Sequence, residues 1–258
     1  MMEKTGNDHS RIGSVPYLNA LPLTRGLESE LRFGTPAHLA TWLRDNKIDA
    51  ALVSVVEVLQ TGQYDLLDGI ALASDGPVWS VLLAHRVPLD KVTVVYLDPA
   101  SLTSTSLVRV LLAERGLRPE MRVLRDYRLT GDLEAVLLIG NRALDFVYGP
   151  HTHSVFDLGE AWQELTGLPF VYAGWALRRG IDQRRLSKLL RQGHANGMAE
   201  LDRIIAEYPR YDAEFREMYL RTCMRFELGD AEKAGLARFG ELLVKHGLGP
   251  VHQPRFVD

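Results

Sequence analysis

Hydroxyl and amide side chains gather at two points where a short apolar run ends in a turn. The first segment is Ser14-Val-Pro-Tyr-Leu-Asn19, and the second is Ser101-Leu-Thr-Ser-Thr-Ser106. Hydroxyls, amides and free backbone N–H groups at the start of a helix are donors where the helix dipole favours negative charge. The first segment therefore predicts a site for an anion and the second a site for a carboxylate, with a plain helix cap and turn as the alternative for each. The candidate binding residues are Ser14, Tyr17, Asn19, Thr103, Ser104, Thr105 and Ser106.

Two further serines lie among apolar strand residues. Ser54 ends the run Ala50–Ser54, and Ser80 ends Gly76-Pro-Val-Trp-Ser80. Two serines at strand ends predict the lining of a cleft, although a buried serine is often satisfied by a backbone carbonyl. Neither lies in a G-x-S-x-G motif, which disfavours a serine hydrolase. The sequence also lacks G-x-x-x-x-G-K-[ST] and G-x-G-x-x-G motifs, so a nucleotide phosphate is not indicated as the anion.

Glu57 and Asp157 lie beside apolar segments and are candidate general bases. The alternative for each is a helix-face or capping residue. His151 and His153 have no nearby Asp, Glu or Cys that completes a metal site, so we expect a loop there and no metal. Four aromatic residues are expected in the core, with a pocket wall as the alternative for one of them: they are Trp162, Phe170, Tyr172 and Trp175.

The sequence predicts alternating strands and helices that position these side chains. Thr35-Pro36 predicts a capped helix start, and Ser101–Arg115 has helical spacing. The tail from Ile181 to Gly247 is expected to be almost wholly helical, with helices at residues 184–207, 213–219 and 230–246. The sequence therefore predicts an α/β protein with mostly parallel sheets. Expected strands include 31–33, 50–54, 79–84, 92–97 and 121–124, with a short helix at 133–135 and further strand signal at 135–139 and 143–148.

Breaks in the pattern near residues 86–90 and 173–180 predict the two strands of a hinge. The first lobe would then contain residues 11–87 and 176–258, and the second lobe residues 88–175. A ligand would bind in the cleft between these lobes.

Composition excludes several classes of protein. The chain has 258 residues, of which 46% are hydrophobic and 24% charged, and its net charge of −3 disfavours nucleic acid as a partner. The single cysteine, Cys223, excludes an internal disulfide and a multi-cysteine zinc site. No apolar run reaches the roughly 18 residues of a membrane span, and Met1–Ser10 lacks the apolar stretch of a signal peptide. We therefore expect a cytoplasmic protein without a membrane partner.

Six segments, taken in order, resemble the chorismate dehydratases of the futalosine route to menaquinone. The resemblance runs from Arg11 to about Leu248. Two positions depart from it: Gly140-Asn141 stands where Gly-Asp is expected, and Ser54-Val-Val replaces a Pro-Ser pairing. The matching segments are residues 11–22, 49–57, 74–83, 98–106, 156–175 and 227–236.

The resemblance implies a periplasmic-binding-protein-like fold of type II, with two α/β lobes around a ligand cleft. It also implies a lyase that removes water from chorismate to give 3-[(1-carboxyvinyl)oxy]benzoate, without metal or organic cofactor. Hydroxyl groups on opposite lobes would each hold one carboxylate of this small-molecule substrate. The implied substrate-binding residues are Ser14, Tyr17, Ser54, Thr103, Ser104, Thr105, Ser106 and Trp175.

Asn19 and Ser80 are the expected catalytic residues. Because an asparagine amide is not a base at neutral pH, we expect Asn19 to orient the substrate while the substrate's enolpyruvyl carboxylate takes the C3 proton. Glu57 and Asp157 are the alternative bases.

Two other functions stay open. A non-catalytic protein that binds small carboxylates would share the fold and the cleft. The sister dihydroxynaphthoate synthase of the same pathway also shares the fold, but it opens with a Ser-Pro-Cys-Pro-Asn-Asp-type motif that Ser14–Asn19 does not match. The sequence leaves the choice between monomer and homodimer open.

Overall fold

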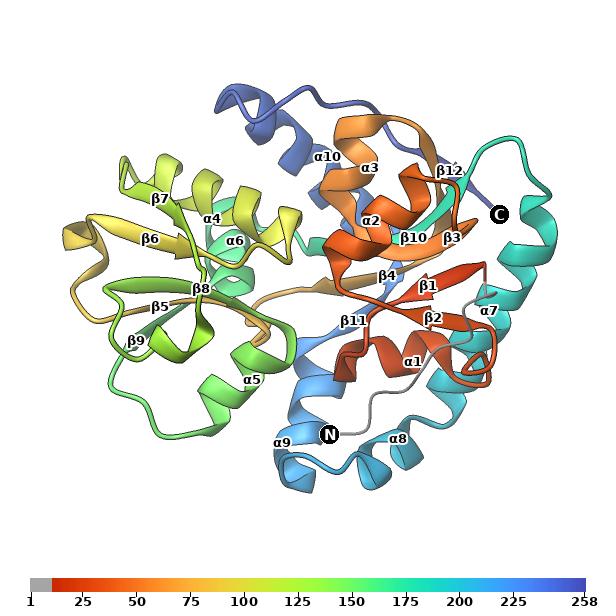
Figure 1. Cartoon of the computed structure of the whole chain (residues 1–258), viewed down its shortest axis with the longest axis horizontal. Helices are drawn as coiled ribbons and strands as arrows, with labels where there is room; N and C mark the ends of the chain where they lie inside the picture. The colour runs from red at the N-terminus through yellow and green to blue at the C-terminus, as the bar shows by residue number, and fades with distance from the viewer. Residues whose placement is uncertain (1–10) are drawn as a thin grey trace.

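The computed structural model describes residues 11–258, which form two α/β lobes lying side by side (Figure 1). The leader Met1–Ser10, on which the expectation of a cytoplasmic protein depends, lies outside the described residues. None of the helices within residues 11–258 combines the length and apolarity needed to cross a bilayer.

The first lobe is built on a sheet with the strand order β11-β4-β10-β3-β1-β2, and β12 also pairs with β4. β1 runs parallel to β2 and β3, whereas β10 runs antiparallel to β3 and β4. Every residue of β3 is buried, as its continuous apolar run predicts. The strands are β1 (Ile12–Ser14), β2 (Leu31–Phe33), β3 (Ala50–Ser54), β4 (Tyr64–Ser74), β10 (Phe170–Arg178), β11 (Arg225–Leu228) and β12 (Arg255–Val257).

The second lobe contains a smaller sheet with the order β7-β6-β8-β5-β9. β6 is parallel to β7 and β8, but β5 is antiparallel to β8 and β9. Both sheets are therefore mixed, and the expectation of mostly parallel sheets was wrong. The reversed strands β5 and β10 are the ones by which the chain enters each sheet from the other lobe. The strands are β5 (Val81–His85), β6 (Val94–Leu97), β7 (Glu120–Val123), β8 (Ala135–Ile139) and β9 (Ser154–Asp157).

The helices begin where the capping signals predict. The Thr35 hydroxyl accepts the His38 N–H at the start of α2, and the Ser101 hydroxyl accepts the Ser104 N–H at the start of α4. The α-helices are α1 (Leu21–Thr24), α2 (Pro36–Arg44), α3 (Val55–Thr61), α4 (Leu102–Glu114), α5 (Gly140–Tyr148), α6 (Leu158–Thr166), α7 (Gln183–Ala199), α8 (Leu201–Glu207), α9 (Ala213–Glu217) and α10 (Asp230–Lys245). Shorter helical turns are η1 (Leu18–Ala20), η2 (Leu89–Lys91), η3 (Tyr127–Leu129) and the π-helical η4 (Met218–Cys223).

Some local expectations differ from the structure. Residues 143–148 form most of α5 and not a strand, since their apolar positions also have helical spacing. The short helix expected at 133–135 is absent, because Ala135 already starts β8. The tail also contains the strand β11, which pairs with β4 and lies between the second and third of the expected helices, where no strand was predicted.

The chain crosses between the lobes earlier than the pattern breaks suggest. β4 ends at Ser74 in the first sheet and β5 begins at Val81 in the second, while β9 ends at Asp157 and β10 begins at Phe170. The sheets thus place residues 81–85 with the second lobe and residues 170–175 with the first, unlike the predicted division at 87/88 and 175/176. The break at 86–90 is instead a turn that follows β5.

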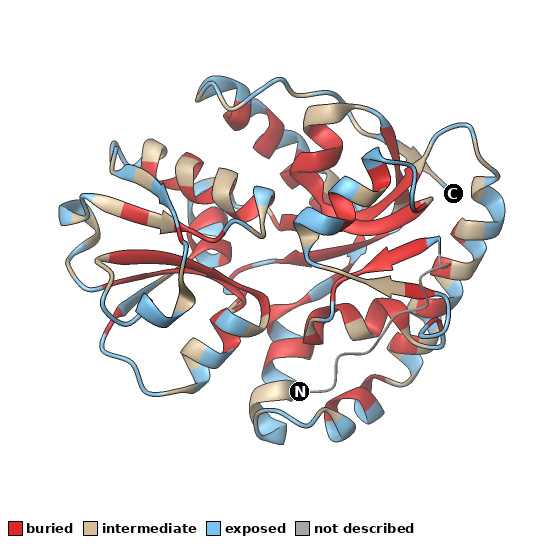
Figure 2. Ribbon diagram, in the orientation of Figure 1, coloured by how far each residue is buried: buried red, intermediate tan, exposed pale blue. Residues whose placement is uncertain are grey.

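The core lies on both faces of the sheets and on the inner sides of the helices (Figure 2). One apolar cluster continues from the first lobe into the second, through residues such as Leu83, Val95 and Leu107. Trp162 and Phe170 belong to this cluster, as predicted, and pack edge to face with centroids 5.0 Å apart. The lobes are therefore joined by packed side chains as well as by the two chain crossings.

Candidate functional site: a cavity between the lobes

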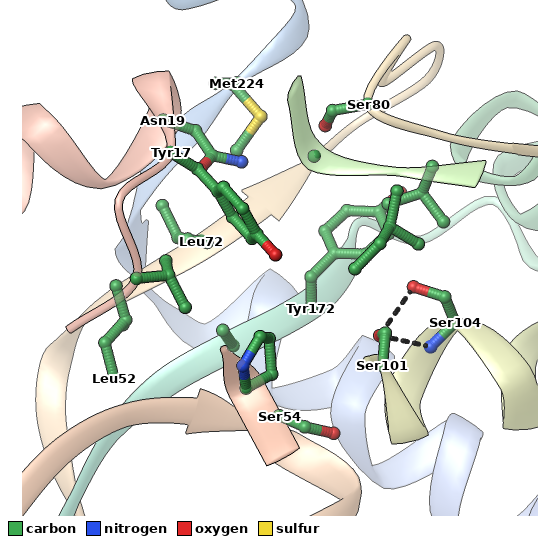
Figure 3. Close-up of a pocket in the computed structure, with 16 residues that line it drawn as sticks. Tyr17, Asn19, Leu52, Ser54, Leu72, Ser80, Ser101, Ser104, Tyr172 and Met224 are labelled. Carbon is green, nitrogen blue, oxygen red and sulfur yellow. Dashed lines mark hydrogen bonds between the residues drawn. The ribbon is translucent and has the colours of Figure 1, made fainter. Parts of the chain in front are cut away.

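A cavity with an empty volume of about 580 Å³ lies between the lobes (Figure 3). Much of the wall is apolar, formed by Val15, Pro36, Leu52, Leu72, Val81, Ile139, Ala173 and Met224. The hydroxyl and amide side chains on the wall are Tyr17, Asn19, Ser54, Ser80, Ser101, Ser104 and Tyr172, and Gly140 completes the lining.

The described wall contains neither a carboxylate nor a cationic side chain. Its polar groups are hydroxyls, one amide and the backbone, so an anion held here would be bound by neutral donors and helix dipoles. Burial and the nearby negative charge of Asp98 raise the pKa of Tyr17 to about 12, and the positive charge of Arg142 opposes this shift. The Tyr17 hydroxyl therefore stays protonated at neutral pH and acts as a donor.

The first predicted segment brings two of its side chains to the cavity. Pro16 follows the short strand β1, and the turn after it carries Tyr17 and Asn19 to the wall. Asn19 is nearly buried, and its Oδ1 has no hydrogen-bond partner within residues 11–258. Ser14 is fully buried at the end of β1 and is not part of the wall. The predicted contact between Ser14 and a ligand is thus not supported by its position.

Ser80 lies on the wall at the point where the chain crosses from β4 to β5. Its Oγ is buried and has no hydrogen-bond partner within the described part of the chain. Its carbonyl accepts the N–H of Gly140 at 2.7 Å, which ties this crossing to the start of α5. Trp79, the preceding residue, has a left-handed backbone with φ of 58°. Such a conformation is unusual for a bulky residue and needs support from its surroundings.

Asp157 supplies that support. Its carboxylate accepts the N–H groups of Val78 at 3.1 Å and Trp79 at 2.7 Å, and also caps α6 through Gly159 at 2.9 Å and Glu160 at 3.1 Å. Burial raises the pKa of Asp157, and the four backbone donors oppose that shift. Asp157 does not line the cavity, so its position favours the capping alternative over the predicted role as a base.

The second predicted segment forms the start of α4. Ser101 and Ser104 both face the cavity, and the Ser101 hydroxyl donates to Ser104 Oγ at 2.9 Å (Figure 3). Thr103 instead turns toward the first lobe, where its Oγ1 lies 2.5 Å from Ser54 Oγ. Thr105 and Ser106 are half-buried elsewhere on the helix and do not belong to the wall. Successive helical residues point in different directions, so a run of hydroxyls cannot all reach one ligand.

Glu57 lies on α3 away from the described wall, with its carboxylate 3.6 Å from Arg44. Burial raises the pKa of Glu57, and the charge of Arg44 opposes this shift.

Trp175 is fully buried in β10 and is likewise absent from the wall. The aromatic residue of β10 that does line the cavity is Tyr172, whose hydroxyl lies 3.0 Å from Ser74 Oγ.

Apart from the apolar residues of the wall, three lining residues were not among the predicted binding residues: Ser101, Gly140 and Tyr172. Tyr172 was expected in the core, with a pocket wall as the alternative for one of the four aromatic residues. Ser101 had a usable signal, because it precedes Ser104 by three residues and such a pair lies on one face of a helix. No comparable signal exists in the sequence for Gly140, whose place on the wall depends on the approach of the second lobe to Tyr17.

Residues 11–258 contain no group of three His, Cys, Asp or Glu side chains placed to hold a metal ion. His151 lies in the loop before β9 and stacks on Phe146, with ring centroids 4.4 Å apart. This placement agrees with the interpretation of His151 and His153 as loop residues.

Comparison with known proteins gives this cavity a context. The chain is 31% identical over 261 residues to the chorismate dehydratase of Thermus thermophilus, covering 90% of this chain and 94% of that protein. It is 26% identical over 229 residues to the chorismate dehydratase of Campylobacter jejuni, covering 86% and 88% of the two chains.

Its fold is similar to that of the periplasmic aliphatic sulphonate binding protein SsuA from Escherichia coli. The TM-score is 0.61 at 15% identity, covering 98% of this chain and 94% of that one. The periplasmic-binding-protein-like fold is thereby confirmed. A family model described as menaquinone biosynthesis matches residues 10–245, and the chain therefore belongs to that family.

Proposed function

We propose that this protein is a chorismate dehydratase, a lyase that converts chorismate to 3-[(1-carboxyvinyl)oxy]benzoate and water. The observation that carries the proposal is a cavity between the lobes with neutral donors from both of them, in a chain of the menaquinone biosynthesis family. The curated relatives with the name chorismate dehydratase cover most of this chain.

Chorismate is a dicarboxylate with one ring hydroxyl, and the wall offers donors at two separated places. Ser101 and Ser104 stand at the N-terminus of α4, where the helix dipole favours a carboxylate. Asn19 and Ser80 lie on other parts of the wall. In this proposal each group of donors holds one end of the substrate, and the apolar wall excludes water from the ring.

The reaction breaks the C3–H and C4–O bonds of chorismate and forms the third double bond of an aromatic ring. Aromatisation makes this step strongly downhill, so the protein has mainly to fix the reactive conformer and suppress competing rearrangement. Preorganised donors and close positioning can provide such selectivity. The elimination transfers no electrons to or from a third molecule, and we propose that it needs no cofactor.

We assign the C3 proton to the enolpyruvyl carboxylate of the substrate itself, with Asn19 and Ser80 orienting the ring. This carboxylate can then deliver the proton to the departing C4 oxygen, so that hydrogen and hydroxyl leave together as water. The positions of Glu57 and Asp157 away from the described wall support this assignment. So does the high pKa of Tyr17, about 12, which keeps that hydroxyl a donor.

The test is to incubate the purified protein with chorismate and to separate the products by chromatography with mass detection. We expect a product lighter than chorismate by one water that retains the enolpyruvyl group. Unchanged chorismate with a folded protein would refute the proposal. Saturable binding without turnover would then favour a carboxylate-binding protein, and absence of binding would favour the sister dihydroxynaphthoate synthase.

A further inference from the structure

We infer that Asn141 is a positioning residue, which reaches from the second lobe to hold the turn that carries Asn19. Asn141 is the second residue of α5 and is not part of the described wall. Its side chain nevertheless contacts the backbone of η1, in the first lobe. This role rests on the proposed function, because Asn19 is assigned there as a residue that orients the substrate.

The contact satisfies a backbone group that its own helical turn leaves free. Leu18 opens η1, and the first N–H groups of a helical turn have no partner within it. The Leu18 N–H donates to Asn141 Oδ1 at 3.2 Å, and Leu18 is completely buried. A buried N–H without a partner is costly, so the interaction ties the position of η1 to that of α5.

The Asn141 side chain is itself held in one orientation. Its Nδ2 donates to the Tyr208 hydroxyl at 3.3 Å, and its backbone carbonyl lies 3.3 Å from the Tyr211 hydroxyl, which also donates to Asp145 Oδ1 at 2.8 Å. Both tyrosines follow α8, in the helical tail. The Asn141 amide is therefore held by Tyr208 through its Nδ2 and by Leu18 through its Oδ1. An asparagine serves here because it offers an acceptor to Leu18 and a donor to Tyr208.

The first turn of α5 also contacts the backbone at or beside both proposed catalytic residues, Ser80 and Asn19. Gly140 donates its N–H to the carbonyl of Ser80 at 2.7 Å and lies against the ring of Tyr17. Asn141 contacts Leu18, the residue before Asn19. The start of α5 therefore sets the distance between Asn19 and Ser80, although Asn141 need not touch the substrate.

The decisive comparison is between Asn141→Ala and Asn141→Asp. Alanine removes the acceptor, and we expect kcat to fall about 10- to 100-fold with KM changed less than about threefold, since a misplaced group costs rate more than binding. Aspartate keeps an acceptor for Leu18, accepts from the Tyr208 hydroxyl instead, and suits a helix N-terminus. We therefore expect Asn141→Asp to keep kcat within about threefold of the natural protein.

Asn196→Ala is the matched control, because Asn196 Nδ2 contacts the carbonyl of Arg25 at 3.4 Å, away from the described wall. Its kcat should stay within about twofold. Thermal unfolding of each variant reports the folded fraction. If Asn141→Ala does not fold, Asn141→Ser replaces it, since the shorter hydroxyl cannot span the same gap.

Amide hydrogen exchange at Leu18 provides a second, activity-independent measurement. We expect faster exchange in Asn141→Ala and protection in Asn141→Asp. Normal kcat in the alanine variant, an equal loss in the aspartate variant or unchanged Leu18 exchange would overturn the inference. If the natural protein does not convert chorismate, the proposed function fails, and Leu18 exchange alone decides whether Asn141 holds η1.

Discussion

Asn19 and Ser80 stand out because Asn19 Oδ1 and Ser80 Oγ are buried at the cavity wall, where the buried Tyr219 hydroxyl is near both residues but completes a full hydrogen bond with neither. Leaving such a group unpaired costs about 1–3 kcal/mol. A ligand that bonds to both of them offsets this cost. These two groups are therefore arranged to bind a ligand, and they lower the stability of the protein when no ligand is bound.

Ser80→Ala tests this reasoning for a single hydroxyl. Removing one preorganised donor typically lowers kcat by about 10²–10³-fold, and we expect a loss in this range in steady-state assays with chorismate. Ser187→Ala is the matched control, because Ser187 is also buried with an unpartnered Oγ but does not line the cavity. Equal activities of the two variants would show that Ser80 has no special role.

Glu57→Gln tests the alternative base and carries a pH signature. Burial holds the pKa of Glu57 above its ordinary value of 4.5, so the unfolded state loses this proton first as the pH rises. The natural protein therefore loses stability as the pH rises above 4.5, the pKa of Glu57 in the unfolded chain. Glutamine does not ionise, so the variant does not lose this stability. We expect the unfolding free energy of the variant, relative to the natural protein, to increase from about pH 4 to about pH 7 in denaturant titrations.

The same variant should keep kcat within about threefold. A loss of about a thousandfold in Glu57→Gln or in Asp157→Asn, with folding intact, would assign the base to the protein and not to the substrate. A stability difference that shrinks with rising pH would contradict the environment given to Glu57.

At the scale of elements, the cavity is formed by the starts of α4 and α5 facing η1 and β3. Gly140, the first residue of α5, has φ of 57°, and a Cβ there would lie 3.1 Å from the nearest atom of the Tyr17 ring. Glycine is therefore needed at this position both for its backbone conformation and for the space beside Tyr17.

Gly140→Ala should lower stability by about 1–2 kcal/mol, the cost of a left-handed backbone for a residue with a Cβ. It should also displace Tyr17 and reduce kcat by about tenfold. Gly116→Ala separates these effects, because Gly116 has φ of 73° but a methyl group added there would meet nothing within 4 Å. Unfolding and turnover measurements should show a similar stability loss in Gly116→Ala with full activity. Full activity in both variants would contradict the contact with Tyr17.

Some helices and strands were predictable from the sequence, and others were not. Capping residues and apolar runs correctly predicted α2, β3 and α4, because these signals act within a few residues. The hydroxyls at the start of α4 were predicted as one group, yet only Ser101 and Ser104 among them line the described wall. Helical periodicity separates Thr103 and Ser106 from this pair, but it does not separate Thr105, which lies four residues after Ser101.

Other differences from the expectations involve contacts between residues that lie far apart in the sequence. Ser14 and Trp175 have suitable residue types, but both are fully buried and neither lies on the described wall, although Trp175 pairs directly with the lining residue Leu52. Local patterns do not determine which residues of a strand the packing of the other elements leaves accessible to a ligand. The same limit explains why the strand β11 and the antiparallel pairing of β10 were not predicted.

At the scale of the molecule, the two lobes close around the cavity and share one apolar cluster. The two-lobed fold was predicted through the resemblance to a family, whereas the crossings lie at residues 75–80 and after Asp157, ahead of the predicted hinge. Polar contacts between the lobes, such as Ser54 with Thr103 and Leu18 with Asn141, lie beside the cavity.

The composition of the described wall predicts a simple pH dependence for the whole enzyme. The wall has no carboxylate, histidine or lysine, and the pKa of Tyr17 is about 12. With the substrate as its own base, we expect kcat/KM for chorismate to vary by less than about threefold from about pH 6 to about pH 9. A bell-shaped profile with an inflection in this range would indicate a titrating protein group.

The most direct test of the central claim is the rate of product formation from chorismate by the natural protein and by Asn19→Ala in the same assay. The cavity's proposed role predicts an aromatic product lighter by one water from the natural protein. The Asn19→Ala variant should form it at least about 100-fold more slowly while remaining folded. Absence of this product from the folded natural protein, or an equal rate from the variant, would contradict the proposed dehydration in this cavity.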